Sequence, residues 1–271
     1  MSATVWTDRP ELSSIAGAAL RFAARFWFAA AVIGQTIFLV YVAAFYGGAA
    51  IGGNMKAWNG VGYRPGATLN NVTVAAHLAL AVVIMLGGPL QLIPKLRSYA
   101  PAFHRWNGRV YMVAVFLTSV AGLYMVWAKP KPTHLVPHLG ISLDALLIIT
   151  FAALALRRAM QRDMRAHRRW ALRLFIVVNA GWFFRVMLML WVFVHRGPAG
   201  FDPESFTGPF INFISFADYL LPLAVLELYL RTGERGSANG RLALAAGLLL
   251  LTVAMGIGIF AASMVLWLPR I

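Results

Sequence analysis

The chain has 271 residues, of which 60% are hydrophobic and only 12% are charged. Soluble domains carry about 25% charged residues, so this composition excludes an ordinary soluble domain and indicates lipid as the main solvent. The formal charge of +15 does not indicate nucleic-acid binding, because the basic residues form short clusters between long apolar runs, as in proteins oriented by charge in a membrane. The chain has no cysteine, which excludes disulfides, iron–sulfur clusters and thiolate chemistry.

Apolar runs long enough to cross a bilayer recur along the whole chain. A transmembrane helix needs about 20 mostly apolar residues, and we expect no cleavable signal peptide before the first run. Seven runs qualify, and they span residues 22–46, 72–93, 106–128, 138–160, 170–194, 210–230 and 242–268. We therefore predict an all-α, polytopic membrane helix bundle with about seven transmembrane helices, forming one integral membrane domain over residues 1–271. The longer connection at 47–71 is expected to form a small lid.

Lysine and arginine are distributed unevenly between the two sides of this predicted bundle. The N-terminus and the second, fourth and sixth connections carry more than twice as many as the opposite side, which predicts a cytoplasmic N-terminus and a C-terminus outside. The basic residues expected outside are Lys56, Arg64, Lys129, Lys131, Arg196 and Arg270.

Four consecutive predicted helices each carry one histidine near the N-terminal end. Because consecutive helices alternate in direction, His77 and His138 are expected on the outer side, and His104 and His167 on the inner side. The separation from His77 to His138 nearly equals that from His104 to His167. We therefore predict a central four-helix core at residues 72–195, built as a tandem helix-pair repeat.

The local sequences around the two inner histidines support this repeat. His104-Arg105-Trp106, followed by Arg109, is similar to His167-Arg168-Arg169-Trp170, followed by Arg173.

Histidine pairs at two depths are typical of haem b sites. The iron takes two axial imidazoles from opposite faces of the ring, and four-helix bundles place such ligands on facing helices. The pattern predicts two haems b, or one, with His77 and His138 on the outer haem iron and His104 and His167 on the inner one. Arg109 and Arg173 are the expected partners of the inner propionates.

Simpler interpretations of the histidines remain open. A histidine at a membrane interface is often only a polar residue at headgroup level, and His195 fits this description. His134 and His138 lie four residues apart and could instead share a zinc or copper ion on one helical face.

Three charged residues, Asp144, Arg185 and Asp218, lie in the interior of predicted spans, more than one helical turn from either end. An unpaired Arg185 there would be costly, and Asp144 or Asp218, at comparable depth, could pair with it. The alternatives are a structural ion pair and a proton or quinol site in the outer half of the membrane.

One motif resembles a known family. The stretch from His104 to Tyr111, with the related motif around His167, resembles the signature of an uncharacterised family of bacterial multi-pass membrane proteins, the domain of unknown function 2306. The layout is also similar to the cytochrome b561 superfamily, in which four consecutive helices supply histidines to two haems b. By position, that resemblance implies pairing of His77 with His138 and of His104 with His167. The resemblance to the bacterial family implies a bacterial inner membrane, and the distribution of lysine and arginine then predicts a periplasmic C-terminus.

These observations predict a b-type cytochrome-like protein that moves electrons across or along the membrane, with a quinone or a redox protein as partner, and hence a transmembrane electron-transfer oxidoreductase. A haem-free transporter or permease is one alternative. A scaffold subunit of a larger membrane complex is another.

Overall fold

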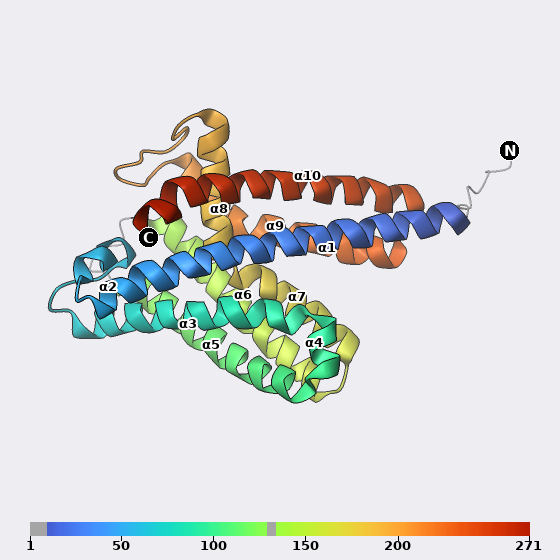
Figure 1. Cartoon of the computed structure of the whole chain (residues 1–271), viewed down its shortest axis with the longest axis horizontal. Coiled ribbons are helices and arrows are strands. Elements are labelled where there is room, and N and C mark those ends of the chain that lie inside the picture. The colour runs from blue at the N-terminus through green and yellow to red at the C-terminus, as the bar shows by residue number, and fades with distance from the viewer. Residues whose placement is uncertain (1–9, 129–133) are drawn as a thin grey trace.

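The computed structural model describes residues 10–128 and 134–271, and this part of the chain is almost entirely helical (Figure 1). The all-α prediction is thereby confirmed. The elements in chain order are α1 (Pro10–Tyr41), η1 (Val42–Gly47), α2 (Gly48–Ile51), η2 (Met55–Val61), α3 (Thr68–Leu92), α4 (Pro94–Tyr99), α5 (Pro101–Trp127), α6 (Leu135–Met160), α7 (Met164–Val178), α8 (Ala180–His195), α9 (Pro209–Arg235), α10 (Ala238–Ala262), η3 (Ser263–Trp267) and η4 (Leu268–Arg270).

Six helical segments are each long and apolar enough to cross a membrane, and α7 with α8 forms a bent pair that would make a seventh. The prediction of about seven spans is therefore confirmed. The continuous fifth helix predicted at 170–194 is wrong, because the chain bends by 53° between α7 and α8. Asn179 marks the break: its side-chain nitrogen donates to the Phe175 carbonyl at 2.7 Å, while its own carbonyl accepts the first amides of α8. A polar side chain thus ends one helix and starts the next inside an apolar run.

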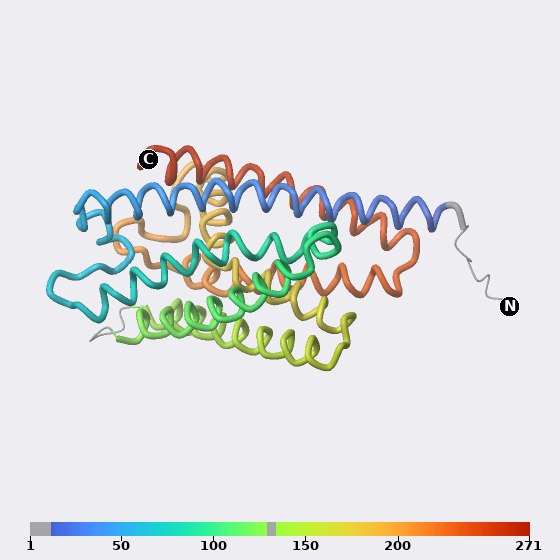
Figure 2. The backbone as a smooth tube through the Cα atoms, turned by 60° about the horizontal axis from the view of Figure 1, so that its bottom comes forward, coloured from blue at the N-terminus to red at the C-terminus, as the bar shows by residue number. Residues whose placement is uncertain are grey.

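The long helices lie side by side along one axis (Figures 1 and 2). α1 and α10 form an antiparallel pair on one face, and the consecutive pairs α3–α5, α5–α6 and α6–α7 pack against each other. α7 also approaches α3, since a Cβ atom at Gly88 would lie 3.6 Å from the Phe175 ring. α8 runs steeply across α10 in both views. The tandem helix-pair repeat stays a prediction.

The two ends of the bundle can be told apart by the short elements that lie there. The C-terminus lies at the end that carries α2 and η2, which we call the C-terminal end, and α4 lies at the opposite end, which we call the α4 end (Figure 1). α1 begins beyond the α4 end, so the described chain starts and finishes on opposite sides.

Small residues allow close contact between helices. In α3, a Cβ atom at Gly87 would lie 3.0 Å from the Asn107 side chain, which donates a hydrogen bond to the Gly87 carbonyl, also at 3.0 Å. In α10, a Cβ atom at Gly258 would overlap with the Val186 carbonyl of α8. The backbones therefore approach more closely than side chains would permit, as is usual in membrane bundles.

The first connection is an ordered cap, in agreement with the lid expected at 47–71. Buried Trp58 donates its indole N–H to the Tyr46 carbonyl at 3.1 Å. The Asn71 side chain accepts from the Arg64 amide at 2.9 Å and donates to the Arg64 carbonyl at 2.7 Å. These bonds attach the cap to α1 and to the start of α3. The basic residues Lys129 and Lys131, used above for orientation, lie outside the described residues.

Candidate functional site

The two histidines at the α4 end lie within electrostatic reach of each other. The charge of His167 acts on His104, as does that of Arg97. The His167 Nδ1 atom lies 2.8 Å from the Ala155 carbonyl oxygen of α6. The His104 Nδ1 atom is buried and has no hydrogen-bond partner in the described part of the chain. The structure therefore brings together the pair predicted for the inner side.

The two histidines of the C-terminal end lie in different surroundings. The His77 ring faces α5, where a Cβ atom at Gly122 would lie 3.6 Å from its Cε1 atom. The ring of buried His138 meets Trp127 edge-on at a centroid distance of 5.8 Å. Trp127 in turn donates to Ser142 at 2.9 Å. Each ring thus packs against the helix between them, α5.

The two arginines expected near propionates each lie over the tryptophan one turn earlier. The Arg109 guanidinium carbon is 4.9 Å from the Trp106 ring centroid, and that of Arg173 is 4.6 Å from the Trp170 ring centroid. Arg173 also forms a two-pronged ion pair with Glu227 of α9, with Nη2 to Oε2 at 2.9 Å. Arg173 therefore already has a carboxylate partner.

The buried carboxylates Asp144 and Asp218 lie near each other rather than near Arg185. The charge of Asp218 acts on Asp144, and both act on Tyr219. The Tyr219 hydroxyl donates to the Gly140 carbonyl at 3.2 Å. One oxygen of each carboxylate is buried without a hydrogen-bond partner in the described ranges. The result is a carboxylate pair between α6 and α9 in the half of the bundle near the C-terminal end.

Arg185 lies elsewhere, and the predicted pairing with Asp144 or Asp218 is wrong. Neither carboxylate appears with Arg185 among the ion pairs that the described residues form. Its Nη1 atom donates to the Gly181 carbonyl at 2.6 Å, and its guanidinium carbon lies 5.1 Å from the Phe38 ring centroid. The physical reason is the break at Asn179, which redirects α8 so that this side chain faces α1.

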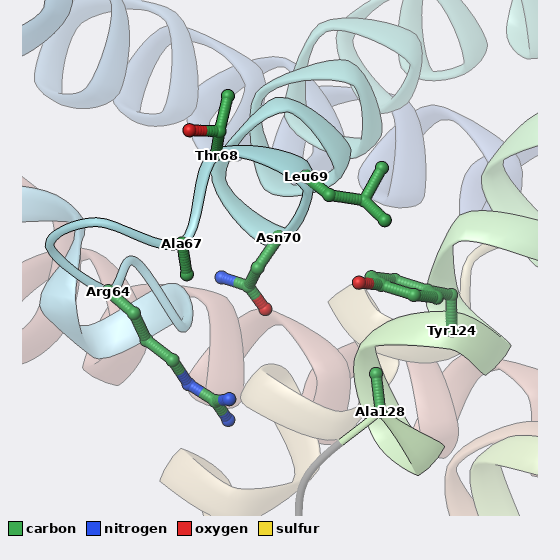
Figure 3. A pocket seen from close by; sticks show the side chains of 7 residues that line it. All are labelled: Arg64, Ala67, Thr68, Leu69, Asn70, Tyr124 and Ala128. Carbon is green, nitrogen blue, oxygen red and sulfur yellow. The ribbon is translucent and has the colours of Figure 1, made fainter.

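Two cavities lie near the C-terminal end. One, of about 320 Å³, lies beside the start of α3, and Figure 3 shows Arg64, Asn70 and Tyr124 among its lining side chains. Its Asn70 nitrogen is already bonded to the Gly62 carbonyl at 2.7 Å. The other, of about 180 Å³, is lined by Arg185 and Arg270 with Tyr41 and Tyr46.

No pattern in the sequence indicates that the arginines and tyrosines of the second cavity come together. Tyr41 ends α1 and Tyr46 lies in the following π-helical turn η1, whereas Arg270 lies far away in sequence, in η4. Five-residue spacing is unusual on one face of an α-helix but occurs in a π-helical turn. Only a prediction of π-helical geometry could have found it.

A metal site on His134 and His138 lacks further ligands. No group of three or more histidine, aspartate or glutamate side chains able to hold a metal ion occurs within residues 10–128 and 134–271. A bis-histidine haem site needs only two, so this finding does not bear on the haem prediction.

The helices and the buried polar groups define a multi-pass membrane protein. Residues 74–202 match the family model described as "Predicted membrane protein (DUF2306)", which confirms the resemblance drawn from the His104 and His167 motifs. Comparisons with curated proteins and with solved structures returned no match. The similarity to the cytochrome b561 superfamily stays a prediction.

Proposed function

We propose that this protein is a b-type membrane cytochrome that carries electrons across or along a bacterial inner membrane, with His104 and His167 as the axial ligands of a haem b. The observation that carries the proposal is the proximity of these two histidines at the α4 end, together with the hydrogen bond that His167 makes. Haem would supply reversible one-electron chemistry at its iron.

The hydrogen bond of His167 fits an axial ligand. A carbonyl oxygen can only accept, so Nδ1 must carry the proton when it lies 2.8 Å from the Ala155 oxygen. The neutral ring then presents an unprotonated Nε2 atom. Metal-bound histidines commonly have this arrangement, in which a backbone carbonyl fixes the tautomer and the ring orientation.

His104 and Arg109 complete the proposed site. The buried, unpaired nitrogen of His104 is costly to leave unsatisfied unless a ligand or a bound group compensates. Arg109 makes no ion pair in the described residues and lies one turn beyond Trp106, so its donors remain free for a carboxylate. Arg173 is the weaker candidate for a propionate, because Glu227 occupies two of its donors.

A second haem on His77 and His138 is part of the proposal but has less support. The Nδ1 atom of His77 is buried without a hydrogen-bond partner in the described chain, although the ring also interacts with the Thr118 backbone of α5. The glycine opposite it, Gly122, leaves space beside the ring. We place the first haem at His104 and His167, and expect the N-terminus in the cytoplasm, the C-terminus in the periplasm, and a quinone or a redox protein as partner.

The test is a reduced-minus-oxidised optical spectrum of the purified protein with the haem-to-protein ratio, after expression with adequate haem supply. We expect a b-type spectrum that is lost or halved in His104→Ala and His167→Ala. The matched control is His195→Ala, whose exposed ring bonds only to the Trp191 carbonyl of its own helix at 2.9 Å. A protein without any Soret band, or equal haem content in all variants, contradicts the proposal.

A second candidate function, a transporter, gains support from the break at Asn179. Transporters often build substrate sites from discontinuous transmembrane helices, and Arg185 lies on α8 shortly after the break. Uptake of small organic anions into proteoliposomes, abolished by Arg185→Ala while haem is absent, would favour this candidate.

A further inference from the structure

The cavity beside Arg185 collects positive charge without a matching negative charge. Arg185 and Arg270 both line it, and the charge of Arg270 acts on Arg185. Neither arginine takes part in an ion pair among the described residues. The two neighbouring cations repel each other, and Arg185, which lies inside the apolar helix α8, also loses hydration, whereas Arg270 stays exposed. A bound anion would offset this cost.

The other polar groups of the cavity are mostly hydrogen-bond donors. Arg270 donates to the Tyr41 hydroxyl at 3.3 Å, and the Tyr41 and Tyr46 rings meet edge-on at a centroid distance of 5.9 Å. Trp267, only 1% exposed, also lines the cavity, and its indole N–H is buried without a partner in the described residues. An indole N–H can only donate, so the Trp267 N–H is left without an acceptor among the described residues.

The remaining walls are apolar. Phe38, Leu78 and Leu266 face the same space as the two arginines. At about 30 Å³ per water molecule, the volume of about 180 Å³ holds about six non-hydrogen atoms. A bare inorganic ion would leave the apolar walls without contacts, whereas a molecule with a charged head and a short apolar tail would satisfy both kinds of wall.

Local backbone geometry assembles this cavity. α1 and α10 both end in π-helical turns, η1 and η3, which contribute Tyr46 and Trp267. The cap residues Gly60 and Val61 of η2 close another side. π-Helical turns are rare and occur often at functional sites, and here two of them border one cavity.

We propose that this cavity is a binding site for a small carboxylate anion with a short aliphatic tail, held by Arg185 and Arg270. The guanidinium groups bind the carboxylate, and the Trp267 indole and a tyrosine hydroxyl donate to its oxygens. The tail packs against Phe38 and Leu78. The site goes beyond the proposed haem function and uses none of its ligands.

The test is isothermal titration of the detergent-purified protein with sodium propionate, at constant pH and ionic strength. Propionamide is the neutral control of the same shape, and inorganic phosphate is the control anion without a tail. We expect propionate to bind, propionamide not to bind, and phosphate to bind more weakly. Arg185→Gln and Arg270→Gln should each weaken propionate binding about tenfold or more, since a hydrogen bond to a charged group contributes about 1.5–3 kcal/mol.

Controls separate loss of the site from loss of the fold. Arg64→Gln changes an arginine of the other cavity and should leave propionate binding unchanged. Arg185→Lys keeps the charge but not the planar fork, and should bind with intermediate affinity. A variant is compared only if it elutes from a size-exclusion column as the same single species as the unmodified protein. If Arg185→Gln does not meet this criterion, Arg270→Gln provides the test.

Three results would overturn the inference: no propionate binding, equal binding in the arginine variants, or phosphate binding as tightly as propionate. Haem content measured on the same samples distinguishes this result from the proposed function. Propionate binding to a haem-free protein supports the carboxylate site while contradicting the cytochrome proposal.

Discussion

Ion pairs in this molecule differ in how well they are shielded from solvent. The Arg173 and Glu227 side chains are 14% and 29% exposed, and they join α7 to α9 through two hydrogen bonds. Glu234 instead contacts Arg165 and Arg169 near the ends of the same helices, and the Arg165 side chain is 81% exposed. Exposed pairs contribute little, whereas breaking a shielded pair leaves a charge without its partner.

Glu227→Gln is therefore expected to destabilise the protein, because Arg173 loses a charged acceptor in a partly buried position. We expect a loss of about 1–3 kcal/mol, measured as the free energy of unfolding or as a lower thermal midpoint in detergent. Arg173→Gln/Glu227→Gln together should recover part of it. Glu234→Gln is the matched control, with an expected change below about 1 kcal/mol. Equal losses in both glutamate variants would contradict this reasoning.

At the scale of elements, the contact between α8 and α10 depends on a missing side chain. Gly258 presses against the backbone of Val186, whereas Gly256, two residues earlier on α10, has nothing within 4 Å of where its Cβ would lie. The same substitution at these two positions thus separates crowding from helix propensity.

Gly258→Ala should force α8 away from α10 and destabilise the protein by about 1–3 kcal/mol. Gly256→Ala should be neutral or slightly stabilising, because alanine favours a helix by about 1 kcal/mol over glycine. Thermal unfolding midpoints of the two variants in one detergent provide the comparison. A midpoint for Gly258→Ala equal to that of Gly256→Ala would show that this contact is looser than described.

The bend between α7 and α8 shortens the distance between the far ends of the two helices by a measurable amount. The helices have 15 and 16 residues and meet at a bend of 53°. With a rise of 1.5 Å per residue, their far ends lie about 42 Å apart, against about 46 Å for one straight helix.

Because the chain has no cysteine, spin labels can be placed at chosen pairs without background. Double electron–electron resonance on Met164→Cys with His195→Cys should give the distance expected for the bent pair, which is shorter than that of a straight helix over the same residues. Leu135→Cys with Met160→Cys, at the ends of the uninterrupted helix α6, is the control and should give its full length. A distance matching a straight helix for the first pair would rule out the bend.

On the scale of the whole molecule, the bundle alternates direction with each long helix, and α9 connects loop 196–208 to the turn before α10 (Figure 1). If α9 crosses the membrane, the two ends of this helix must face different compartments. The same alternation places His77 and His138 toward one end, and His104 and His167 toward the other.

Single cysteines at Ala199 and Gly233 should therefore react with a membrane-impermeant maleimide from opposite sides of sealed vesicles. With the orientation proposed above, the cysteine at position 199 reacts in intact spheroplasts and the one at 233 only after lysis. Labelling of both from one side would contradict a membrane-spanning α9, and the reverse pattern would contradict the proposed orientation alone.

Much of this architecture follows from local sequence. The length of an apolar run is a local property, so the positions of six helices could be predicted from the apolar runs alone. The same runs place the histidines near the N-terminal ends of their helices.

Other features could not be predicted because they depend on geometry that hydrophobicity does not encode. Asn179 in an apolar run looks like one polar residue among many, yet it ends α7. Once the chain bends there, Arg185 turns from the aspartates toward Tyr41 and Tyr46. Identification of the cavity also required the π-helical turns, for which single sequences carry no clear periodicity.

The division of one predicted span into α7 and α8 also bears on biogenesis. The two helices have 15 and 16 residues, fewer than the roughly 20 that a lone helix needs to cross the hydrocarbon. The first two turns of α7 also carry three arginines, Arg165, Arg168 and Arg169. A translocon that releases helices one at a time would therefore find no self-sufficient segment between α6 and α9. Stable insertion of this stretch requires partner helices already in the membrane, so the order of helix release during synthesis becomes part of how the protein is made.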